Sequence, residues 1–326
     1  MRWTWAIGAL TLCGCAASCR GDGSRTPPAG GSSDTTAGPA TSSTAGLSTD
    51  GAGADTTTGT GATTGGFDPA AIDVQAHRGD RANHPPGNTL VAFTAALELG
   101  VDTLEGDMQI TADGAVVLGH DDDLAVTGCE LSDPGVMPIP SRKLSEMTLA
   151  EVARWDCHPE VDGVQSPPEL ADVLALDDDV AFNLELKRLT EADADVYLSA
   201  LIAYDSGCGG CLSGRLTVQC FAWSTLAYAR ATYHAHNAGS ALAFDVSLLA
   251  VVPSLADLAT AAVYADVVSP SFAEVTPELV TTAHDLALRV VPWTVNDPEA
   301  MQALLDLGVD GLITDDPATL LALLGR

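Results

Sequence analysis

Two strand-like segments carry charged or polar side chains at alternate positions, where a buried strand would be apolar. Successive side chains of a strand point to opposite faces, so each set lies on one face. An unpaired buried charge costs more free energy than strand propensity gains, so these sets indicate a functional site rather than a core. They are Asn183, Glu185 and Lys187 in segment 181–187, and Glu105 and Asp107 in segment 103–107.

Three of these side chains are carboxylates, which cannot all stay ionised close together without a cation, because like charges raise each other's pKa values. All-oxygen ligands favour Ca²⁺ or Mg²⁺ over zinc. We therefore predict that Glu105, Asp107 and Glu185 bind a divalent metal. The alternative is a set of structural ion pairs without metal, in which Glu185 pairs with Lys187 and Glu105 pairs with Arg78.

Two histidines adjoin this predicted site. His77 ends an apolar segment and is followed by Arg78. An Asp-Gly pair at 113–114, between extended flanks, predicts a hairpin that returns His120 beside Asp107. Imidazoles placed in this way could accept and donate protons. The other five histidines lack such neighbours, and we interpret them as surface or core residues: His84, His158, His234, His236 and His284.

Repeated βα units are the elements that would position these residues. Short β-branched or apolar runs alternate with helical stretches closed by Gly, which is typical of a parallel sheet. Eight units over about 260 residues match a TIM-like (β/α)₈ barrel of the α/β class, with an open doubly wound sheet as the alternative. The predicted strands are 72–77, 103–107, 181–187, 216–221, 241–246, 265–269, 289–295 and 311–314.

Helix signals mark the first and last units. Asn88 is expected to cap the first helix, and Gly100 to follow its end. Asp316 and Pro317 form a cap and first-turn pair for the last helix. The stretch 121–168 fits no strand–helix unit, so we predict a hairpin and an insertion after the second strand, on the face of the barrel that carries functional loops.

The first 19 residues have the features of an export signal, with Arg2, an apolar stretch at 3–12 and small residues at 14–18. Cys15 and Cys19 each follow small or apolar residues, as the lipidated cysteine of bacterial lipoproteins does. We therefore expect an exported cell-envelope lipoprotein. The alternative is an ordinary cleaved signal, which would leave the protein periplasmic or secreted.

Residues 20–66 cannot form a core, because only seven of these 47 residues are not Gly, Ser, Thr, Ala or Pro. Such a tract behaves as a flexible coil, so we predict a disordered linker between the signal segment and a single domain at 67–326. A tether that spaces the domain from its anchor and a linker without selected length predict the same sequence.

The chain has 14 Lys and Arg against 44 Asp and Glu, a formal net charge of −30. This balance argues against a nucleic-acid partner. The one early apolar run is shorter than the roughly 20 residues needed to span a bilayer, so the only expected membrane link is the N-terminal lipid anchor. An exported protein meets abundant calcium, which favours Ca²⁺ over Mg²⁺ at the predicted metal site.

The motifs of the domain resemble those of the glycerophosphodiester phosphodiesterase family. Together they are specific and span nearly all of residues 74–316, whereas any one of them alone would be weak. They are His77-Arg78-Gly79, Asn88-Thr89 with Ala92-Phe93, Glu105-Gly106-Asp107, Thr111-Ala112-Asp113-Gly114, His120-Asp121, Asn183-Leu184-Glu185-Leu186-Lys187, Trp293-Thr294-Val295-Asn296 and Gly311-Leu312-Ile313-Thr314-Asp315.

The resemblance implies a TIM-like barrel that hydrolyses glycerophosphodiesters to glycerol 3-phosphate and an alcohol. It further implies that Glu105, Asp107 and Glu185 are metal ligands, that His77 and His120 are the acid/base pair, that Arg78 and Lys187 bind phosphate, and that Trp293 covers the glycerol carbons; barrel packing is the alternative for Trp293. Two further hypotheses stay open: a barrel phospholipase of the phospholipase D or sphingomyelinase type, and a catalytically silent binding lipoprotein.

One position departs from the family pattern. Where the family usually has Glu-Asn-Thr, this chain has Gly87-Asn88-Thr89, so a carboxylate expected beside Arg78 is missing. Asp80 is the nearby acid that could substitute for it.

Export favours disulfides among the cysteines of the domain. We predict a Cys129–Cys157 bridge that closes the insertion and a Cys208–Cys211 bridge, with Cys220 left as the odd thiol. A zinc or redox role for the Cys208–Cys211 pair is the weaker interpretation, because no second ligand pair accompanies it.

Overall fold

The computed structural model describes residues 67–135, 141–236 and 242–326. Contacts divide the chain into two units, Met1–Gly61 and Ala62–Arg326, and every described residue belongs to the second unit. The predicted signal segment and linker lie outside the described residues. Among the described helices, none is long and apolar enough to cross a membrane.

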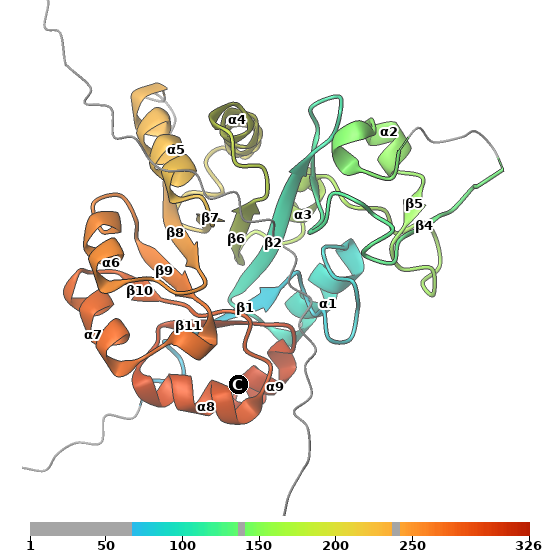
Figure 1. The fold of residues 1–326 in the computed structure, drawn as a ribbon. Coiled ribbons are helices and arrows are strands. Elements are labelled where there is room, and N and C mark those ends of the chain that lie inside the picture. Colours follow the sequence, from blue (N-terminus) through green and yellow to red (C-terminus); the bar gives the residue numbers. More distant parts are fainter. Residues whose placement is uncertain (1–66, 136–140, 237–241) are drawn as a thin grey trace, which may run out of the picture. The chain divides into compact units, whose positions relative to one another are not determined.

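The second unit is built from alternating strands and helices, confirming the predicted βα pattern (Figure 1). Its strands are β1 (Asp73–His77), β2 (Thr103–Ile110), β3 (Val116–Leu118), β4 (Glu130–Leu131), β5 (Trp155–Asp156), β6 (Ala181–Leu186), β7 (Leu216–Cys220), β8 (Phe244–Ala250), β9 (Val267–Pro270), β10 (Arg289–Val290) and β11 (Gly311–Thr314). Its helices are α1 (Leu90–Leu99), η1 (Leu144–Glu146), α2 (Leu149–Val152), α3 (Leu170–Leu174), α4 (Glu191–Cys208), α5 (Trp223–His236), α6 (Leu255–Ala261), η2 (Phe272–Glu274), α7 (Pro277–Asp285), α8 (Pro298–Leu307) and α9 (Pro317–Leu324).

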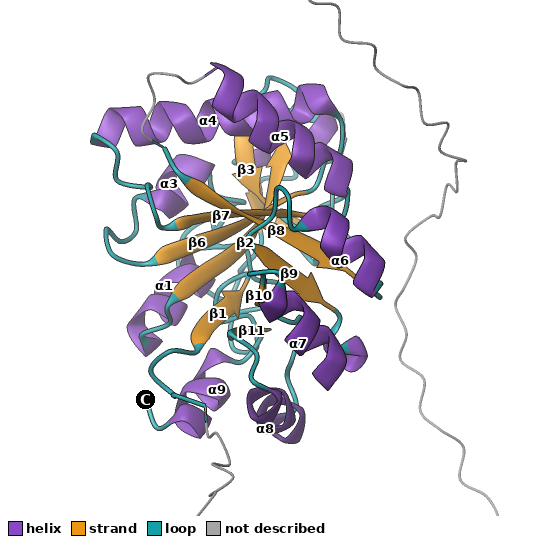
Figure 2. Ribbon diagram, turned by 90° about the vertical axis from the view of Figure 1, so that its left-hand side faces the viewer, coloured by secondary structure: helices purple, strands orange, loops and turns teal. Residues whose placement is uncertain are grey.

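Eight parallel strands form a nearly closed barrel. Figure 2 shows the strands at the centre and the helices around them. Their order is β10-β9-β8-β7-β6-β2-β1-β11. Backbone hydrogen bonds from Asp310 to Val290, from Val295 to Ile313 and from Ile313 to Pro292 join the two ends of this order. The TIM-like barrel is therefore confirmed, and the open doubly wound sheet is wrong.

Most predicted strands differ from the observed ones at an end, and β10 and β8 are two examples. β10 ends at Val290, well before residue 295, and Pro292 has no N–H to donate to a sheet. β8 begins at Phe244 and continues to Ala250, with Ser247 buried and hydrogen bonded to Ser269 of β9 at 2.9 Å between the hydroxyl oxygens. Apolar patterning predicts which segments form strands, whereas pairing with neighbours decides where each one stops.

Helix caps agree with the sequence signals except at α1. Gly100 ends α1 in the left-handed conformation, and Asp316 caps α9 with Pro317 in its first turn, as predicted. The predicted cap Asn88 is wrong: the Thr89 side chain accepts the hydrogen bond from Ala92 N. Because Thr89 caps the helix, the side chain of Asn88 can form hydrogen bonds elsewhere.

The predicted hairpin and insertion are both present. β2 and β3 pair antiparallel, with Met108 opposite Leu118. The insertion has its own small core, which includes Leu144, Val152 and Trp155, and in Figure 1 β4, β5 and α2 lie together beyond the end of β2. The Cys129–Cys157 disulfide links this core, and both this bridge and the buried free Cys220 were predicted. Closing a loop of this length contributes about 3–4 kcal/mol under the chain-entropy model.

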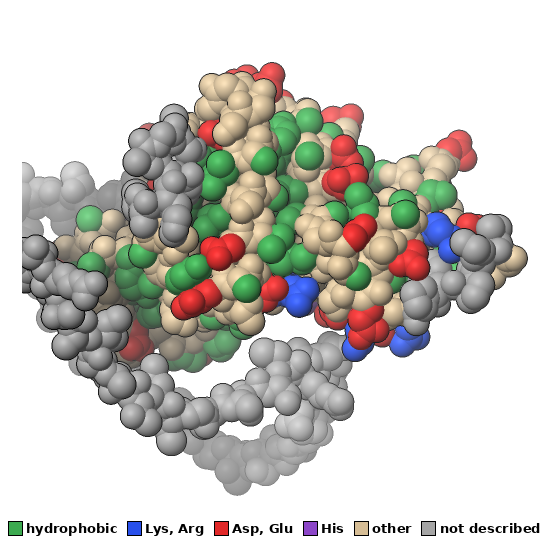
Figure 3. Space-filling view, turned by 90° about the horizontal axis from the view of Figure 1, so that it is seen from above, with side chains coloured by type: hydrophobic (Ala, Val, Ile, Leu, Met, Phe, Trp, Pro, Cys, Tyr) green, Lys and Arg blue, Asp and Glu red, His purple; other side chains and the backbone are tan. Residues whose placement is uncertain are grey.

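Acidic side chains are spread over the face seen in Figure 3, with few basic side chains among them. This distribution matches the net charge of −30.

Candidate active site

The carboxyl ends of β1, β2 and β6 bring six of the predicted site residues to one mouth of the barrel. In the register of these neighbouring strands His77 lies opposite Glu105, and Asp107 lies opposite Glu185. Arg78 and Lys187 directly follow β1 and β6. The parallel register thus turns three separate sequence motifs into one cluster.

Three carboxylates form the floor of this cluster. Glu105, Asp107 and Glu185 are buried, and each offers an oxygen within 4.8 Å of the others. Burial, followed by the charge of Asp107, raises the pKa of Glu185 to about 8. Burial and Asp107 also raise the pKa of Glu105 well above its ordinary value. Such carboxylates are destabilised as anions in the absence of a cation.

The donor set fits a hard divalent cation. All three side chains supply oxygens, and Asp107 Oδ1 is buried without a hydrogen bond among the described residues. Lys187 Nζ lies 3.4 Å from this oxygen. A buried carboxylate oxygen without a hydrogen-bond donor is available for a metal ligand bond, so these residues could hold Ca²⁺ or Mg²⁺.

Asp107 is the most heavily partnered of the three carboxylates. Its Oδ2 lies 3.0 Å from Arg78 Nε and accepts a 2.8 Å hydrogen bond from Asn88 Nδ2, while its backbone N donates to Asn88 Oδ1. Burial would raise the pKa of Asp107, but Arg78 and Lys187 hold it far below the ordinary value. Asp107 is therefore the anion of the group at neutral pH.

The ion-pair alternative is half right. Lys187 Nζ does lie 3.0 Å from Glu185 Oε1. The guanidinium of Arg78, however, pairs with Asp107, and Glu105 instead accepts the backbone N–H of Arg78 at 3.1 Å. Two cations thus face three carboxyl groups, so a bound metal would supply the further positive charge that lets all three ionise.

Amide side chains inside the barrel hold Glu105 in place. Gln219 Nε2 donates to Glu105 Oε1 at 2.7 Å, and Asn183 Nδ2 donates to both Gln219 Oε1 and Gln75 Oε1. These residues are buried. They fix the glutamate orientation without adding charge.

His77 is oriented by a carboxylate from the last strand. Its Nδ1 lies 2.6 Å from Asp315 Oδ1, and Asp315 also accepts hydrogen bonds from Arg81 and Asn296. Burial lowers the pKa of His77, although Asp315 opposes this shift. The hydrogen bond to Asp315 places the ring proton on Nδ1, so Nε2 is the nitrogen left to accept a proton.

The hairpin returns His120 to the same mouth, as predicted. Gly119 N donates to Asp107 O at 2.8 Å, which fixes the end of the returning strand beside β2. His120 is partly exposed, and its Nδ1 lies 3.2 Å from Asp121 Oδ2. Burial lowers the pKa of His120, while Asp107 opposes this shift. The two histidines therefore approach the carboxylates from different loops.

A cavity of about 500 Å³ opens between the barrel mouth and the insertion. Arg78, Gly87 and His120 lie on its barrel side, and Val126 and the Cys129–Cys157 disulfide lie on its insertion side. The terminal nitrogens of Arg78 make no hydrogen bond among the described residues. The cavity thus offers a cation and an imidazole to a molecule of modest size.

The backbone explains why residue 87 lacks a side chain. Gly87 has φ +79°, and a Cβ there would lie 2.7 Å from Arg78 Cβ and 2.9 Å from Arg78 O. Asp80 does not substitute for the missing carboxylate, since it accepts hydrogen bonds from Asn83 instead. Asp107 is the carboxylate that pairs with Arg78.

We expect Gly87→Ala to destabilise the protein more than Gly214→Ala. Both glycines have φ near 80°, where alanine is strained by about 1 kcal/mol, but nothing lies within 4 Å of a Cβ at Gly214. The contact with Arg78 should raise the cost at Gly87 to about 2–4 kcal/mol, measured by thermal unfolding. Equal losses of stability in the two variants would contradict the close contact.

Trp293 lies farther along the mouth, after β10. Its Nε1 donates to Ser269 O at 2.7 Å, and its ring packs against Val267, Val291 and Ile313. Its ring also meets the ring of Phe221 edge to face, at 5.4 Å between centroids. Trp293 therefore packs in the barrel, as its alternative interpretation stated, and is also partly open at the mouth.

Sequence reasoning missed three residues of the site. Asp315 orients His77, Asn88 holds Asp107, and Gln219 holds Glu105. Asp315 directly follows β11, and this position at a strand end is the signal that could have identified it as a site residue. No sequence signal identifies Gln219, because an amide in a strand has no distinctive spacing.

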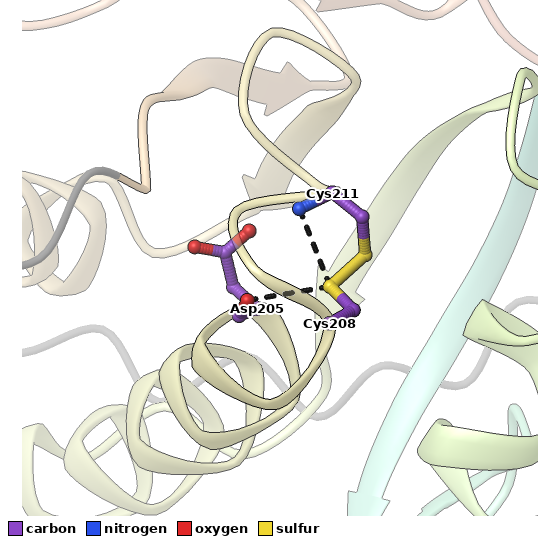
Figure 4. A group of neighbouring side chains, drawn as sticks. All are labelled: Asp205, Cys208 and Cys211. Atoms are coloured by element: carbon purple, nitrogen blue, oxygen red, sulfur yellow. Dashed lines mark hydrogen bonds between the residues drawn. A yellow bond between two sulfur atoms is a disulfide. The ribbon is translucent and has the colours of Figure 1, made fainter.

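A second cluster of potential ligands, Asp205, Cys208 and Cys211, lies at the end of α4. Figure 4 shows the two sulfurs joined, and the predicted Cys208–Cys211 disulfide is confirmed. Cys211 N donates a hydrogen bond to Cys208 Sγ at 3.2 Å, and the same sulfur, which has no hydrogen in the disulfide, lies 3.3 Å from Asp205 O. Sulfurs bonded to each other are unavailable as thiolate ligands, so this cluster closes the helix end.

The barrel and its mouth define the class of protein. The barrel mouth combines carboxylates that can bind a metal, cationic side chains and two imidazoles. This combination is typical of hydrolases that act on anionic esters. The family model that matches residues 77–319 is the glycerophosphoryl diester phosphodiesterase family. The chain belongs to this family.

Relatives and solved structures agree with this assignment. A glycerophosphodiester phosphodiesterase of Caldanaerobacter subterraneus subsp. tengcongensis is 29% identical over 78% of this chain and 98% of its own. A crystal structure from Silicibacter pomeroyi, provisionally named a glycerophosphoryl diester phosphodiesterase, has TM-score 0.66 and 28% identity over 79% of this chain and 97% of its own. An Oleispira antarctica phosphodiesterase, solved with its product sn-glycerol 3-phosphate, shares the fold with TM-score 0.64 and 19% identity over 79% and 98% of the two chains.

Proposed function

We propose that this protein is a metal-dependent phosphodiesterase that hydrolyses glycerophosphodiesters to glycerol 3-phosphate and an alcohol. The observation that carries the proposal is the buried group Glu105, Asp107 and Glu185 with two imidazoles and two cations around it. A phosphodiester is an anionic, poor electrophile, so the site must supply positive charge and move protons.

Positive charge comes from two sources. A divalent cation bound by the three carboxylates would neutralise the phosphate oxygens and make the phosphorus more electrophilic. Arg78 binds the phosphate through its terminal nitrogens, and Lys187 through Nζ, which lies 3.0 Å from Glu185 and 3.4 Å from Asp107. Because Ca²⁺ is abundant outside the cytoplasm, we propose it ahead of Mg²⁺.

The two histidines move the protons. His77 is neutral at pH 7, because burial lowers its pKa, and it accepts a proton at Nε2 from the attacking water. His120 lines the cavity and gives a proton to the leaving alkoxide there. Water adds to phosphorus, the P–O bond to the alcohol breaks, and the alcohol leaves through the cavity.

Incubation of the purified protein with several glycerophosphodiesters, with quantification of glycerol 3-phosphate, tests this function. Release of glycerol 3-phosphate that depends on a divalent cation supports the proposal. Binding of the substrate without any turnover would instead favour a silent binding protein.

We further propose that the mature protein is a cell-envelope lipoprotein anchored through Cys15 or Cys19, with residues 20–66 as a tether. Mass spectrometry of the mature N-terminus should find a lipidated cysteine. Limited proteolysis should release a stable fragment that begins near Phe67, because the composition of residues 20–66 predicts a flexible linker. An unlipidated N-terminus on a protein found free in the medium would contradict the anchor.

A further inference from the structure

The loop that leaves β6 carries Lys187 just beyond the end of the sheet. This loop, residues 187–190, joins β6 to α4 and is here called the Lys187 loop. The parallel register of β2 and β6 ends with Met108 opposite Leu186. Beyond this point Lys187 N donates to Met108 O at 3.3 Å, which is long for such a bond. The sheet alone therefore fixes the backbone of Lys187 only weakly.

A tyrosine hydroxyl from α4 adds two hydrogen bonds at this point. Tyr197 Oη donates to Met108 O at 3.0 Å, and it accepts a hydrogen bond from Arg188 N at 3.3 Å. Burial raises the pKa of Tyr197, so the hydroxyl keeps its proton and can both donate and accept. One hydroxyl thus joins the residue after Asp107 to the residue after Lys187.

Tyr197 is placed by the buried face of α4. Ala194, Tyr197, Leu198 and Leu201 recur at helical spacing and are buried, so this face of the helix packs on the barrel. The Tyr197 ring belongs to the main core. A phenylalanine would fill the same space, so packing does not by itself require the hydroxyl.

A second helix hydroxyl bonds to the same loop. Thr225 of α5 is buried, and its Oγ1 donates to Leu189 O at 2.7 Å. Two helices outside the barrel thus fix the short Lys187 loop from different sides. The Thr225 bond is two residues from Lys187, whereas the Tyr197 bonds are at the next residue and at the carbonyl that Lys187 N itself contacts.

The Lys187 side chain needs a fixed backbone to do its work. Its Nζ lies 3.0 Å from Glu185 Oε1 and 3.4 Å from Asp107 Oδ1. Both carboxylates stand on strands whose register fixes them. Lysine, in contrast, is a compact charge on a flexible stem, so the place of its ammonium depends on where its backbone is held.

We propose that Tyr197, assisted by Thr225, is a positioning residue for phosphate binding. The two hydroxyls fix the Lys187 loop, so that the Lys187 ammonium stays between the carboxylates and the phosphate of the substrate. This inference rests on the proposed function, which assigns Lys187 to the phosphate. Neither hydroxyl touches the substrate, and both act through Lys187.

Binding of glycerol 3-phosphate, measured by calorimetry, tests this role without turnover. Tyr197→Phe should weaken binding by about 3–10-fold, the size expected for the loss of one hydrogen bond, and Thr225→Val should weaken it less. Tyr204→Phe is the matched control, because Tyr204 lies on the same helix, is partly buried and makes no side-chain hydrogen bond among the described residues. It should bind as the wild type does.

A double-variant cycle with Lys187→Met separates positioning from a general loss of structure. Arg78 and the carboxylates remain in Lys187→Met, so its weaker binding is still measurable. If Tyr197 acts through Lys187, adding Tyr197→Phe to Lys187→Met should change the affinity by less than about twofold. With glycerophosphocholine, Tyr197→Phe should raise KM more than it lowers kcat, because Lys187 meets the phosphate before the reaction as well as during it.

The outcomes distinguish this inference from the proposed function. Unchanged affinity in a folded Tyr197→Phe, or an equal loss with and without Lys187, overturns the inference, and hydrolysis by the wild type would then leave the proposed function standing. Coupling between Tyr197 and Lys187 in a protein without turnover supports the inference and removes the function. A wild type that neither hydrolyses nor binds glycerol 3-phosphate overturns both. If thermal unfolding shows that Tyr197→Phe does not fold, the same cycle with Thr225→Val decides.

Discussion

Replacing either catalytic histidine candidate should lower kcat by about 10²–10⁴-fold, the usual loss when a general acid or base is removed. His77→Ala removes the imidazole held by Asp315, and His120→Ala removes the one at the cavity. Neither side chain belongs to the apolar core, so both variants should fold. Binding of glycerol 3-phosphate should be nearly unchanged, because the cations and carboxylates remain.

The pH profile distinguishes the two histidines. If His77 must be neutral and His120 must be protonated, the profile is bell-shaped, and each substitution removes one limb. The acid limb belongs to His77 and should lie below pH 6.5, because burial lowers the pKa of this imidazole below that ordinary value. Effects of the two substitutions should be less than additive, since both serve one proton-transfer cycle. A double variant with a kcat near that of the wild type would contradict this mechanism.

Chelation should abolish hydrolysis, and a hard divalent cation should restore it. The physical reason is that Glu105, Asp107 and Glu185 lie within 4.8 Å of one another and face only two positive side chains. Activity should fall to background with excess chelator, and Glu185→Gln should bind metal more weakly while keeping the shape of the side chain. Full activity in excess chelator would remove the metal from the mechanism.

The same site makes stability depend on pH in a defined direction. Without metal, Glu185 in the folded protein keeps its proton up to about pH 8, whereas an ordinary glutamate loses it near 4.5. The folded state binds more protons between these values, so the free energy of unfolding falls as pH rises through this range. A bound cation displaces that proton, so Ca²⁺ should raise the Tm more at pH 8 than at pH 6.

Glu185→Gln is the control for this pH dependence, because it removes the titrating group. Its Ca²⁺-induced gain in Tm should be smaller than that of the wild type and should change less with pH. A wild-type gain that is equal at pH 6 and pH 8 would contradict the raised pKa of Glu185.

Much of the fold could be predicted from the chain, because local chemistry decides it. Alternating apolar runs and glycine-closed helices indicate eight βα units, and the Asp-Gly pair at 113–114 indicates the hairpin. The ends of elements were harder, as β8 and β10 illustrate. Their lengths depend on pairing with neighbouring strands, which no local pattern records.

The residues of the candidate site were visible because they break the pattern of their strands. Glu105, Asp107 and Glu185 lie at buried positions of otherwise apolar strands. Burying a carboxylate costs free energy, so these residues indicate a functional site. Their partners were less visible. Asn88 has the sequence position of a helix cap, yet it holds Asp107, because Thr89 caps α1.

The sequence by itself determined the barrel class, the charged residues at strand ends, the two disulfides and the family resemblance. Periodicity, cysteine number and motif composition can all be read from the order of the residues alone. Only the tertiary structure decided that Asp107, and not Asp80, pairs with Arg78 and that Asp315 orients His77. These facts depend on strand register and barrel closure, which bring residues together across as many as 238 positions of sequence.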